Sequence, residues 1–476
     1  MYPSLEQFKE LSKRYNRITV YKEIDGDMDT PVSILSRLLS LDRVILLESA
    51  KESKVYSRFS FLAFDIREKV LVQEDGLYNG GRRLGDIAHL EEVLLQNRPA
   101  PLEGFGDFSG GYAGYLNFGF TGQCDILRQP LAHKGACGGV LYLVEKFCVY
   151  DNYTNRLYIA LSKKIDGNIP PEGIYERIAD ELARSEGELR GLPMVHPMPI
   201  DAAVTRSIPK ERFMEKVRAI KTMIENGEAI QIVLSDYVEI ENLDPFQFYR
   251  NLRKINPSPY MFFIKDANTS IVGSSPEVHI RVRGNTAFLR PIAGTRPHDG
   301  GDGIEEITRE LAEDEKEKAE HLMLVDLARN DLSRICRPGS VVVESFMQPE
   351  VYSHVVHLVS QVKGELKDDS DTVEAITRTF PAGTVSGAPK TRAIEIIDEL
   401  EDGPRGVYAG CTGYIGFNGN ADMAITIRTA VFNGFKARLQ AGAGIVYDSV
   451  PEREYREVMS KLKALLRAGG IDDSAY

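Results

Sequence analysis

The sequence predicts an α+β protein built of layered sheets and helices rather than a doubly wound parallel sheet. Strand-like and helix-like runs intermix along the chain without the regular strand–helix–strand rhythm of doubly wound proteins. The chain has 476 residues, enough for one large or two ordinary domains with a substantial buried core. We expect a smaller β-rich part at the N-terminus, followed by a larger part in which helices and strands mix.

The N-terminal part, residues 1–165, is expected to consist mainly of short strands. Gly and Pro clusters separate its β-rich runs, which predict strands at 44–47, 59–62, 111–115 and 140–144. Residues 166–205 are expected to form a helix, at 175–185, and then a linker, because Gly and Pro gather between 191 and 199.

The larger part, residues 206–470, begins with the clearest helix. Between Lys210 and Glu225 apolar residues recur at helical spacing, and Asn226-Gly227 ends the run. Further helices are expected at 304–328, 372–379, 389–399 and 451–467. Strands are expected at 229–238, 260–264, 278–282, 341–346, 356–362, 408–417, 423–432 and 436–442.

Composition argues against several classes of protein. The net charge of −12 disfavours a general nucleic-acid binder, which would present a basic face. No apolar run approaches the ~20 residues needed to cross a bilayer, so we expect no membrane partner. The N-terminal residues lack the apolar core of a signal peptide. The five cysteines are odd in number and widely scattered, which predicts a reduced, cytoplasmic protein.

Two acidic pairs stand out in separate predicted helices: Glu317 with Glu320, and Glu454 with Glu457. The spacing of three residues places both carboxylates of a pair on one helical face. Four carboxylates converging from two helices would form an all-oxygen site, which suits a hard cation and Mg²⁺ above all. The chain contains 70 Asp and Glu residues, so ordinary solvated carboxylates are the alternative interpretation.

Five sequence islands occur together in the second part of the chain. They are Pro291–Arg296, Glu320–Asp331, Val356–Ser360, Thr379–Lys390, and Gly442–Val446 followed by Asp448-Ser449. In content and order they resemble the chorismate-binding domain shared by anthranilate, aminodeoxychorismate, isochorismate and salicylate synthases. The resemblance implies the layered α/β/β/α fold of that family. It also implies a reaction in which a nitrogen or oxygen nucleophile adds to C2 of chorismate and the C4 hydroxyl leaves.

The resemblance assigns the acidic residues to a Mg²⁺ site. Glu320 and Glu457 match the inner ligands, and Glu317 and Glu454 match supporting ligands that often act through water. Chorismate carries two carboxylates, which four glutamates would repel unless the cation lay between them. Metal and substrate are therefore expected to bind together.

Four residues are expected to carry out or assist the chemistry. Glu277 matches the family's general acid, which must protonate the departing hydroxide and so needs a pKa raised by burial. His357 matches the active-site histidine, although a lone histidine in a strand-like run is more often a hydrogen-bonded core residue. Thr384 is expected to hydrogen-bond the ring substituents or His357. Gln231 lies where synthases that use water generally place a lysine base.

Substrate binding requires donors for the second carboxylate of chorismate. Arg428 lies in a strand-like run, 424–431, and a buried arginine usually has an anionic partner. Lys461, four residues after Glu457, could add positive charge. The resemblance also assigns substrate contacts to small or hydroxyl-bearing positions, namely Gly294, Thr295, Tyr408, Gly442, Ala443 and Gly444. The amides of 442–444 would form a cradle; a plain tight turn is the alternative.

The nucleophile is expected to be ammonia. Besides Gln231, Ala293 lies where aminodeoxychorismate synthases often carry a lysine, and this chain has neither lysine. None of the cysteines lies in a Gly-x-Cys-x-Gly-x-Gln glutaminase motif, so we expect a separate glutamine amidotransferase subunit and a hetero-oligomer. These features favour the aminase component of an anthranilate synthase. The alternatives are an aminodeoxychorismate synthase component I and a non-catalytic tryptophan-sensing subunit.

A feedback site is also implied. Leu46–Ser49, Arg58–Phe61 and Asn256–Met261 are similar to the tryptophan-binding signatures of anthranilate synthase component I. Tryptophan is therefore expected to bind as an inhibitor at Glu48, Ser49, Pro259, Tyr260 and Met261. Two positions depart from the family pattern: His298 replaces a frequent arginine, and Ser460-Lys461-Leu462 replaces Asn-Lys-Ala. Neither removes a group that the chemistry needs.

Overall fold

The structure is a computed structural model of the chain. It describes residues 1–49, 58–97, 99–102, 106–124, 126–127, 130–131, 138–191, 202–298, 303–351, 355–368 and 370–471. Within the stretch predicted as a linker, residues 192–201 lie outside these described residues.

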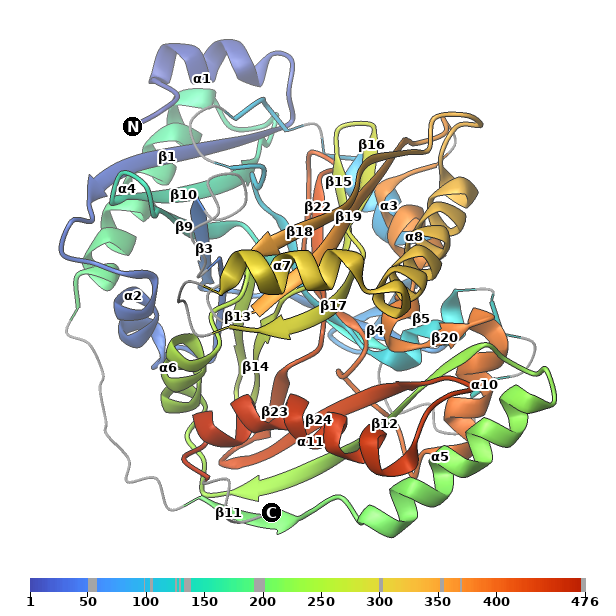
Figure 1. Cartoon of the computed structure of the whole chain (residues 1–476). Helices are drawn as coiled ribbons and strands as arrows, with labels where there is room; N and C mark the ends of the chain where they lie inside the picture. The colour runs from blue at the N-terminus through green and yellow to red at the C-terminus, as the bar shows by residue number, and fades with distance from the viewer. Residues whose placement is uncertain are drawn as a thin grey trace.

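The described strands form two 12-stranded sheets (Figure 1). The first sheet contains β1 (Arg17–Asp25), β2 (Arg43–Glu48), β3 (Phe59–Phe64), β9 (Lys146–Asp151), β10 (Arg156–Lys164), β11 (Ala203–Arg206), β12 (Gln231–Glu241), β13 (Tyr260–Asp266), β14 (Thr269–Ser275), β20 (Gly387–Ala388), β23 (Thr429–Asn433) and β24 (Lys436–Ile445). The second contains β4 (Lys69–Gln73), β5 (Gly76–Asn79), β6 (Arg82–Gly85), β7 (Gly111–Leu116), β8 (Gly139–Val144), β15 (Val278–Arg283), β16 (Thr286–Leu289), β17 (Ile292–Pro297), β18 (Val342–Val351), β19 (Val355–Glu365), β21 (Cys411–Gly416) and β22 (Ala421–Ile425).

Both sheets combine strands from the N-terminal and the C-terminal parts of the chain. The order in the first is β1-β10-β9-β3-β2-β13-β14-β23-β24-β12-β11, with β20 beside β12. In the second it is β17-β19-β16-β15-β22-β21-β7-β8-β4-β5-β6, with β18 beside β19. Strand β2 pairs with β13 and β7 pairs with β21. The division at about residue 165 stays a prediction about chain organisation, since neither sheet is interrupted there.

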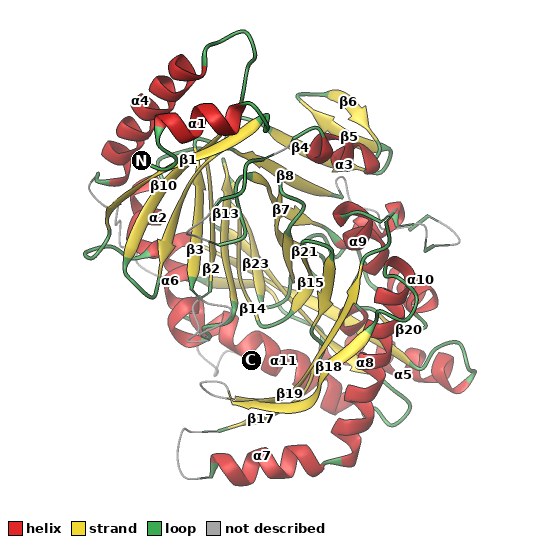
Figure 2. Cartoon of the chain, turned by 90° about the horizontal axis from the view of Figure 1, so that it is seen from above, coloured by secondary structure: helices red, strands yellow, loops and turns green. Residues whose placement is uncertain are grey.

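Helices cover the outer faces of the two sheets (Figure 2). They are α1 (Leu5–Ser12), α2 (Pro31–Leu38), α3 (Ala88–Leu95), η1 (Phe118–Gln123), α4 (Pro171–Leu189), α5 (Lys210–Glu225), α6 (Pro245–Ile255), α7 (Ile304–Glu313), α8 (Glu315–Ile335), α9 (Thr372–Thr379), η2 (Gly383–Val385), α10 (Lys390–Leu400) and α11 (Pro451–Ala468). Among the described residues, no helix has both the length and the apolar character that would let it cross a membrane.

Strand alternation explains the layers. In β2, Val44 and Leu46 pack with helices on the outer face of the first sheet, whereas Ile45 packs between the sheets. The inter-sheet core also contains Val140 and Tyr142 of the second sheet, while Leu141 packs with helices on that sheet's outer face. The arrangement confirms the predicted α/β/β/α layering.

Two predicted elements are each divided in the structure. The helix expected at 304–328 is two helices, because Asp314 has an extended backbone and caps α8 by accepting from the amides of Lys316 and Glu317. The strand expected at 423–432 is two strands that belong to different sheets. The break lies at 426–428, where Arg428 has a left-handed φ of 50°.

A second crossing between the sheets runs beside this one. Residues Pro276 and Glu277 connect β14 of the first sheet to β15 of the second. The Ile425 amide donates to the Glu277 carbonyl (3.0 Å), and the Ser274 amide donates to the Arg428 carbonyl (3.1 Å). These two hydrogen bonds hold the crossing segments side by side.

Candidate active site

Glu277 is a buried carboxylic acid in the crossing that connects β14 to β15. Its residue is 9% exposed, and burial raises the pKa of its carboxyl to about 7. Thr384, Lys461 and Arg428 lie close enough to oppose that rise. The two cations and the hydroxyl only partly offset the rise in pKa that burial causes. Glu277 therefore retains a proton near neutral pH and can donate it.

Arg428 belongs to the crossing that connects β22 to β23 and not to a strand, contrary to the sequence-based prediction. Burial lowers the pKa of its guanidinium, and the charge of Glu277 opposes this shift. Its Nη1 donates to Asn256 Oδ1 at 3.3 Å. The guanidinium is part-buried beside Glu277, where an anionic group can bind.

Thr384 lies in η2, on a turn facing Glu277. Its hydroxyl is buried and has no hydrogen-bond partner within the described part of the chain. A cavity of about 40 Å³ separates the two residues from the apolar side chains of Leu324 and Leu327 on α8. A buried hydroxyl without a partner is costly, so this threonine is suited to bonding a ligand group.

His357 lies in β19, and its ring is fixed by the main chain. Its Nδ1 lies 2.9 Å from the carbonyl oxygen of Gly294. A carbonyl only accepts, so Nδ1 carries a proton, and in the neutral ring Nε2 is the basic nitrogen. His357 does not line the small cavity beside Glu277.

Gly294 occupies an irregularity in β17, where the register with β19 shifts between Ala293 and Thr295. Its φ is +64°, and an added Cβ would meet Leu311 Cδ1 at 2.9 Å and Glu317 Oε2 at 3.2 Å. Glycine is therefore required for β17 to approach α8. The backbone of Thr295 pairs with His357, while its side chain lies outside the described residues.

The two acidic pairs do converge from α8 and α11. The pKa of Glu320 is raised by burial and then by the neighbouring charges of Glu317 and Glu457. The pKa of Glu454 is raised by burial and by Glu457, against the effect of Ser449. Like charges held together in this way favour a bound cation.

Each pair also has one carboxylate engaged with a side-chain cation. Glu317 contacts Arg296 Nη1 at 2.9 Å, and Glu457 contacts Lys461 Nζ at 2.7 Å. Within the described ranges, no group of three His, Cys, Asp or Glu side chains is gathered closely enough to hold a metal ion. The carboxylate donors fit Mg²⁺ by type, and binding would require Glu317 and Glu457 to exchange these partners for the metal.

The predicted glycine cradle is part of β24 and not a turn. Strand β12 directs the Val233 amide to Ser386 and the Ser235 amide to Glu401, away from β24. By the antiparallel pattern, the facing amides of Gly444 and Gly442 also point away from β12, whereas that of Ala443 points toward it. Gly442 and Gly444 can thus meet a ligand through their amides, but Ala443 cannot, which corrects that prediction.

These glycines also make room for two predicted site residues. A Cβ at Gly444 would lie 2.4 Å from Gln231 Nε2, and one at Gly442 would lie 2.9 Å from Tyr408 Oη. Both Gln231 and Tyr408 are buried. Lys461 bonds the Gly442 carbonyl (2.9 Å), which fixes α11 against this edge of β24.

A larger cavity of about 830 Å³ lies between the sheets. Residues from both sheets line it, among them all five of the predicted inhibitor site: Glu48, Ser49, Pro259, Tyr260 and Met261. The Ser49 hydroxyl is buried and, among the described residues, lacks a hydrogen-bond partner. Tyr260 bonds Asp422 (2.9 Å) and Arg281 (2.8 Å) across the cavity.

The carboxylate of Glu48, a predicted tryptophan contact, already has partners within the protein. It accepts from Tyr249 Oη at 2.6 Å and from Arg253 Nη2 at 2.7 Å, both on α6. Strand alternation places Glu48 on the helix-covered face of β2 and Ser49 on the opposite one. Glu48 therefore fastens α6 to the strand, and the cavity offers a hydroxyl and main-chain groups instead.

Sequence reasoning missed two polar residues that support the site. Asn256, which accepts from Arg428, was noted only as part of a motif. Arg405, in Gly403-Pro404-Arg405-Gly406, resembles an exposed turn residue, yet it is 5% exposed. Because two of its partners, the carbonyls of Val385 and Val233, are distant in the sequence, no local pattern marks it.

Comparison with known proteins places these features in a family. The sequence model described as chorismate binding enzyme matches residues 43–467, which includes strands of both parts of the chain. Proteins named anthranilate synthase component 1 from Acetivibrio thermocellus and Aquifex aeolicus are 38% and 39% identical to this chain. The alignments cover 98% of this chain in both cases, and 98% and 97% of the relatives.

Solved structures agree in fold. Anthranilate synthase component I from Streptococcus pneumoniae superposes with a TM-score of 0.75 at 33% identity, over 87% of this chain and 93% of that one. The menaquinone-specific isochorismate synthase of Escherichia coli superposes with a TM-score of 0.70 at 20% identity, over 98% of both chains. The second likeness concerns the fold alone.

Proposed function

The chain belongs to the family of chorismate-binding enzymes, and on that premise we propose that it is the chorismate-using component of an anthranilate synthase. It would convert chorismate and ammonia to anthranilate and pyruvate, a lyase reaction of tryptophan biosynthesis. The near-full-length relatives of that name support this proposal. The observation that carries it is the buried Glu277, protonated near neutral pH and flanked by Arg428 and Lys461.

The first step needs a proton on the departing C4 hydroxyl. Glu277 holds such a proton in a site sheltered from water, and Thr384 can orient the hydroxyl toward it. Arg428 supplies a part-buried positive charge for a substrate carboxylate, and the amides of Gly442 and Gly444 add donors. His357, held through Nδ1 by the Gly294 carbonyl, presents Nε2 as the group that accepts a ring proton on aromatisation.

Neutral side chains in the site favour ammonia over water as the nucleophile. Gln231 is buried against Gly444, and Ala293 is buried in β17, where other members of the family carry lysines. A glutamine cannot deprotonate water, whereas unprotonated ammonia needs no base. We propose that ammonia reaches C2 from the side lined by Gln231.

We propose Mg²⁺ as the cofactor, held by Glu320 and Glu457 with support from Glu317 and Glu454. When bound there, it would neutralise the acidic residues and a carboxylate of chorismate, which polarises the substrate. The raised pKa values of Glu320 and Glu454 support a cation at this point.

We propose two further partners. The ammonia would come from a separate glutamine amidotransferase subunit, in keeping with the component 1 naming of the relatives. Tryptophan would bind as an inhibitor in the inter-sheet cavity, next to Ser49. A cytoplasmic location is supported by four buried cysteines that form no disulfide with one another: Cys124, Cys148, Cys336 and Cys411.

The direct test is incubation of the purified chain with chorismate, Mg²⁺ and ammonium, with anthranilate followed by its fluorescence. We expect fluorescence to grow with the wild-type chain and to be lost with Glu277→Gln, which keeps the shape but not the acid. Mass spectrometry of the product separates anthranilate from an amine that retains its enolpyruvyl group. Accumulation of the second product would contradict the proposal.

A further inference from the structure

A buried ion pair lies directly behind the turn that carries Thr384. Arg405 and Glu401 are joined by two hydrogen bonds, Nη2 to Oε1 at 2.6 Å and Nε to Oε2 at 2.9 Å. Their side chains are 1% and 6% exposed. A salt bridge this deeply buried contributes little net stability, because the cost of desolvation offsets the attraction. Stability therefore does not explain the presence of this pair.

The remaining donors of Arg405 bind the main chain on both sides of the turn. Nη1 donates to the Val385 carbonyl at 2.8 Å, one residue after Thr384. Nη2 donates to the Val233 carbonyl of β12 at 2.6 Å. The Val233 amide in turn donates to the Ser386 carbonyl at 2.9 Å. The guanidinium thus replaces a strand partner of β12 at the point where the turn leads into β20.

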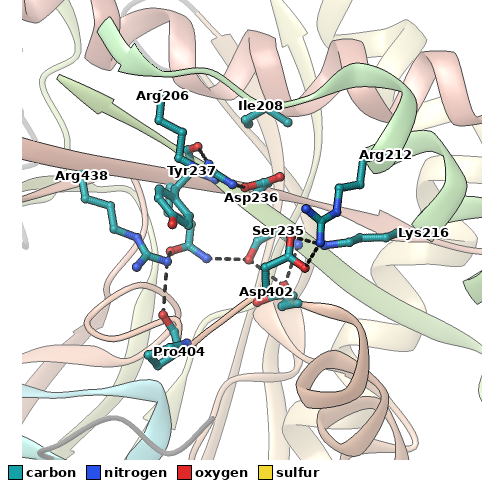
Figure 3. A network of polar contacts seen from close by, with 12 residues as sticks. Arg206, Ile208, Arg212, Lys216, Ser235, Asp236, Tyr237, Asp402, Pro404 and Arg438 are labelled. Carbon is teal, nitrogen blue, oxygen red and sulfur yellow. Dashed lines mark hydrogen bonds and ion pairs between the residues drawn. The ribbon is translucent and has the colours of Figure 1, made fainter.

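The segment that carries the pair is anchored from outside (Figure 3). Asp402 bonds Arg212 (2.7 Å) and Lys216 (2.9 Å) of α5, and the Pro404 carbonyl accepts from Arg438 of β24 (3.2 Å). Figure 3 also shows Ser235, whose hydroxyl and amide both donate to Glu401 at 2.8 Å. Because α5, β12 and β24 fix this segment, Arg405 has little freedom to move.

We infer that Arg405 is a positioning residue, which holds the turn at 383–386 on β12 so that the Thr384 hydroxyl stays beside Glu277. The guanidinium also lies 4.6 Å from the ring centre of Phe118 and 5.7 Å from that of Tyr408, another predicted substrate contact. A planar fork is needed, because a lysine cannot bond two carbonyls and a carboxylate at these angles. The inference rests on the proposed function, since Thr384 acts only if chorismate reacts here.

The primary variant is Arg405→Lys, which keeps a positive charge opposite Glu401. We expect kcat for ammonia-dependent anthranilate formation to fall about tenfold to a hundredfold, with little change in KM for chorismate, as for a displaced catalytic contact. In a Thr384→Val background the same substitution should cause no further loss, because the residue acts through Thr384. An unchanged kcat, or an equal loss in both backgrounds, would overturn the inference.

Arg17→Lys is the matched control. Arg17 is also buried, bonds Glu145 (2.9 Å) and the Ser162 carbonyl (3.2 Å), and stacks on Phe417 at 4.0 Å, but it lies in the edge strand β1. We expect it to lower the melting temperature and leave kcat unchanged. An equal loss of kcat would show that any buried arginine has this effect, and would overturn the inference.

Two measurements cover the other outcomes. If Arg405→Lys does not fold, Glu401→Gln is the second variant. The glutamine oxygen can still accept from Ser235, but it holds the Arg405 guanidinium less tightly. An unchanged kcat in this variant would then contradict the inference. Hydrogen exchange is independent of activity: the Val233 amide should exchange faster in Arg405→Lys and not in Arg17→Lys. If the wild type makes no anthranilate, the proposed function fails. Faster exchange of the Val233 amide in Arg405→Lys would still show that Arg405 holds the turn at 383–386 on β12, and unchanged exchange would overturn that role.

Discussion

Glu277 and Arg428 lie on neighbouring segments that cross between the two sheets in opposite directions. Hydrogen bonds from Ile425 to Glu277 and from Ser274 to Arg428 hold the segments side by side. Each side chain alters the pKa of the other, so an acid and a cation are kept together in a buried place. Such a pair can bind an anionic substrate and protonate it in one geometry.

Glu277 sets a pH dependence. Its raised pKa, about 7, means that the carboxyl is protonated below that pH and loses its proton above it. With the rate expressed per free ammonia, kcat/KM should therefore be highest below pH 7 and fall as pH rises through that value. The pH profile of Glu277→Gln should be low and flat, and a wild-type profile that does not fall would exclude Glu277 as the acid.

The acidic pairs predict metal dependence. Glu320→Gln or Glu457→Gln should reduce turnover by about a hundredfold or more at sub-millimolar Mg²⁺, because each removes a charged ligand. Glu315→Gln is the control, since that side chain is 88% exposed on the same helix. Titration of Mg²⁺ against activity checks this, and full activity of either variant at low Mg²⁺ would contradict the assignment.

The nitrogen source should be separable from the chain. Purified alone, it is expected to form anthranilate from ammonium salts, faster as pH rises and ammonium is deprotonated to ammonia, until loss of the Glu277 proton limits the rate. It should form none from glutamine, because none of its cysteines lies in a glutaminase motif. Production of glutamate from glutamine by the purified chain is the result that would refute the two-subunit arrangement.

Gly444→Ala should disturb the ammonia side of the site. The added Cβ would lie 2.4 Å from Gln231 Nε2, so the amide must move. We expect kcat/KM for ammonia to fall roughly tenfold, as for a misplaced contact. Gly187→Ala, on the open surface of α4 with no atom within 4 Å, is the matched control and should behave as wild type.

Tryptophan inhibition should depend on Ser49. Its unpartnered hydroxyl borders the inter-sheet cavity, and Ser49→Phe would fill that space. The variant should need at least about tenfold more tryptophan for half inhibition, with uninhibited turnover little changed, because the site is separate from Glu277. Tryptophan inhibition curves at a fixed chorismate concentration test this. Equal sensitivity of wild type and variant to tryptophan would contradict the assignment of the inhibitor site.

Periodicity in the sequence was enough to predict most elements, because an amphipathic helix or strand shows its buried face in its own residues. Helices α5 and α9 begin and end at the predicted residues. The acidic pairs on α8 and α11 were also readable, since a spacing of three fixes a common helical face. For the remaining site residues, the motifs predicted which residues take part but not how they are arranged.

Tertiary structure alone decided how those residues are used. An apolar run does not reveal that a strand changes sheet, which is why 423–432 was predicted as one strand and Arg428 was misplaced. It also does not reveal pairing, so the engagement of Glu48 by Arg253 and of the Ala443 amide by β12 went unseen. Arg405 is the clearest case, because its burial and its bonds to the Val385 and Val233 carbonyls depend on contacts between residues far apart in the chain.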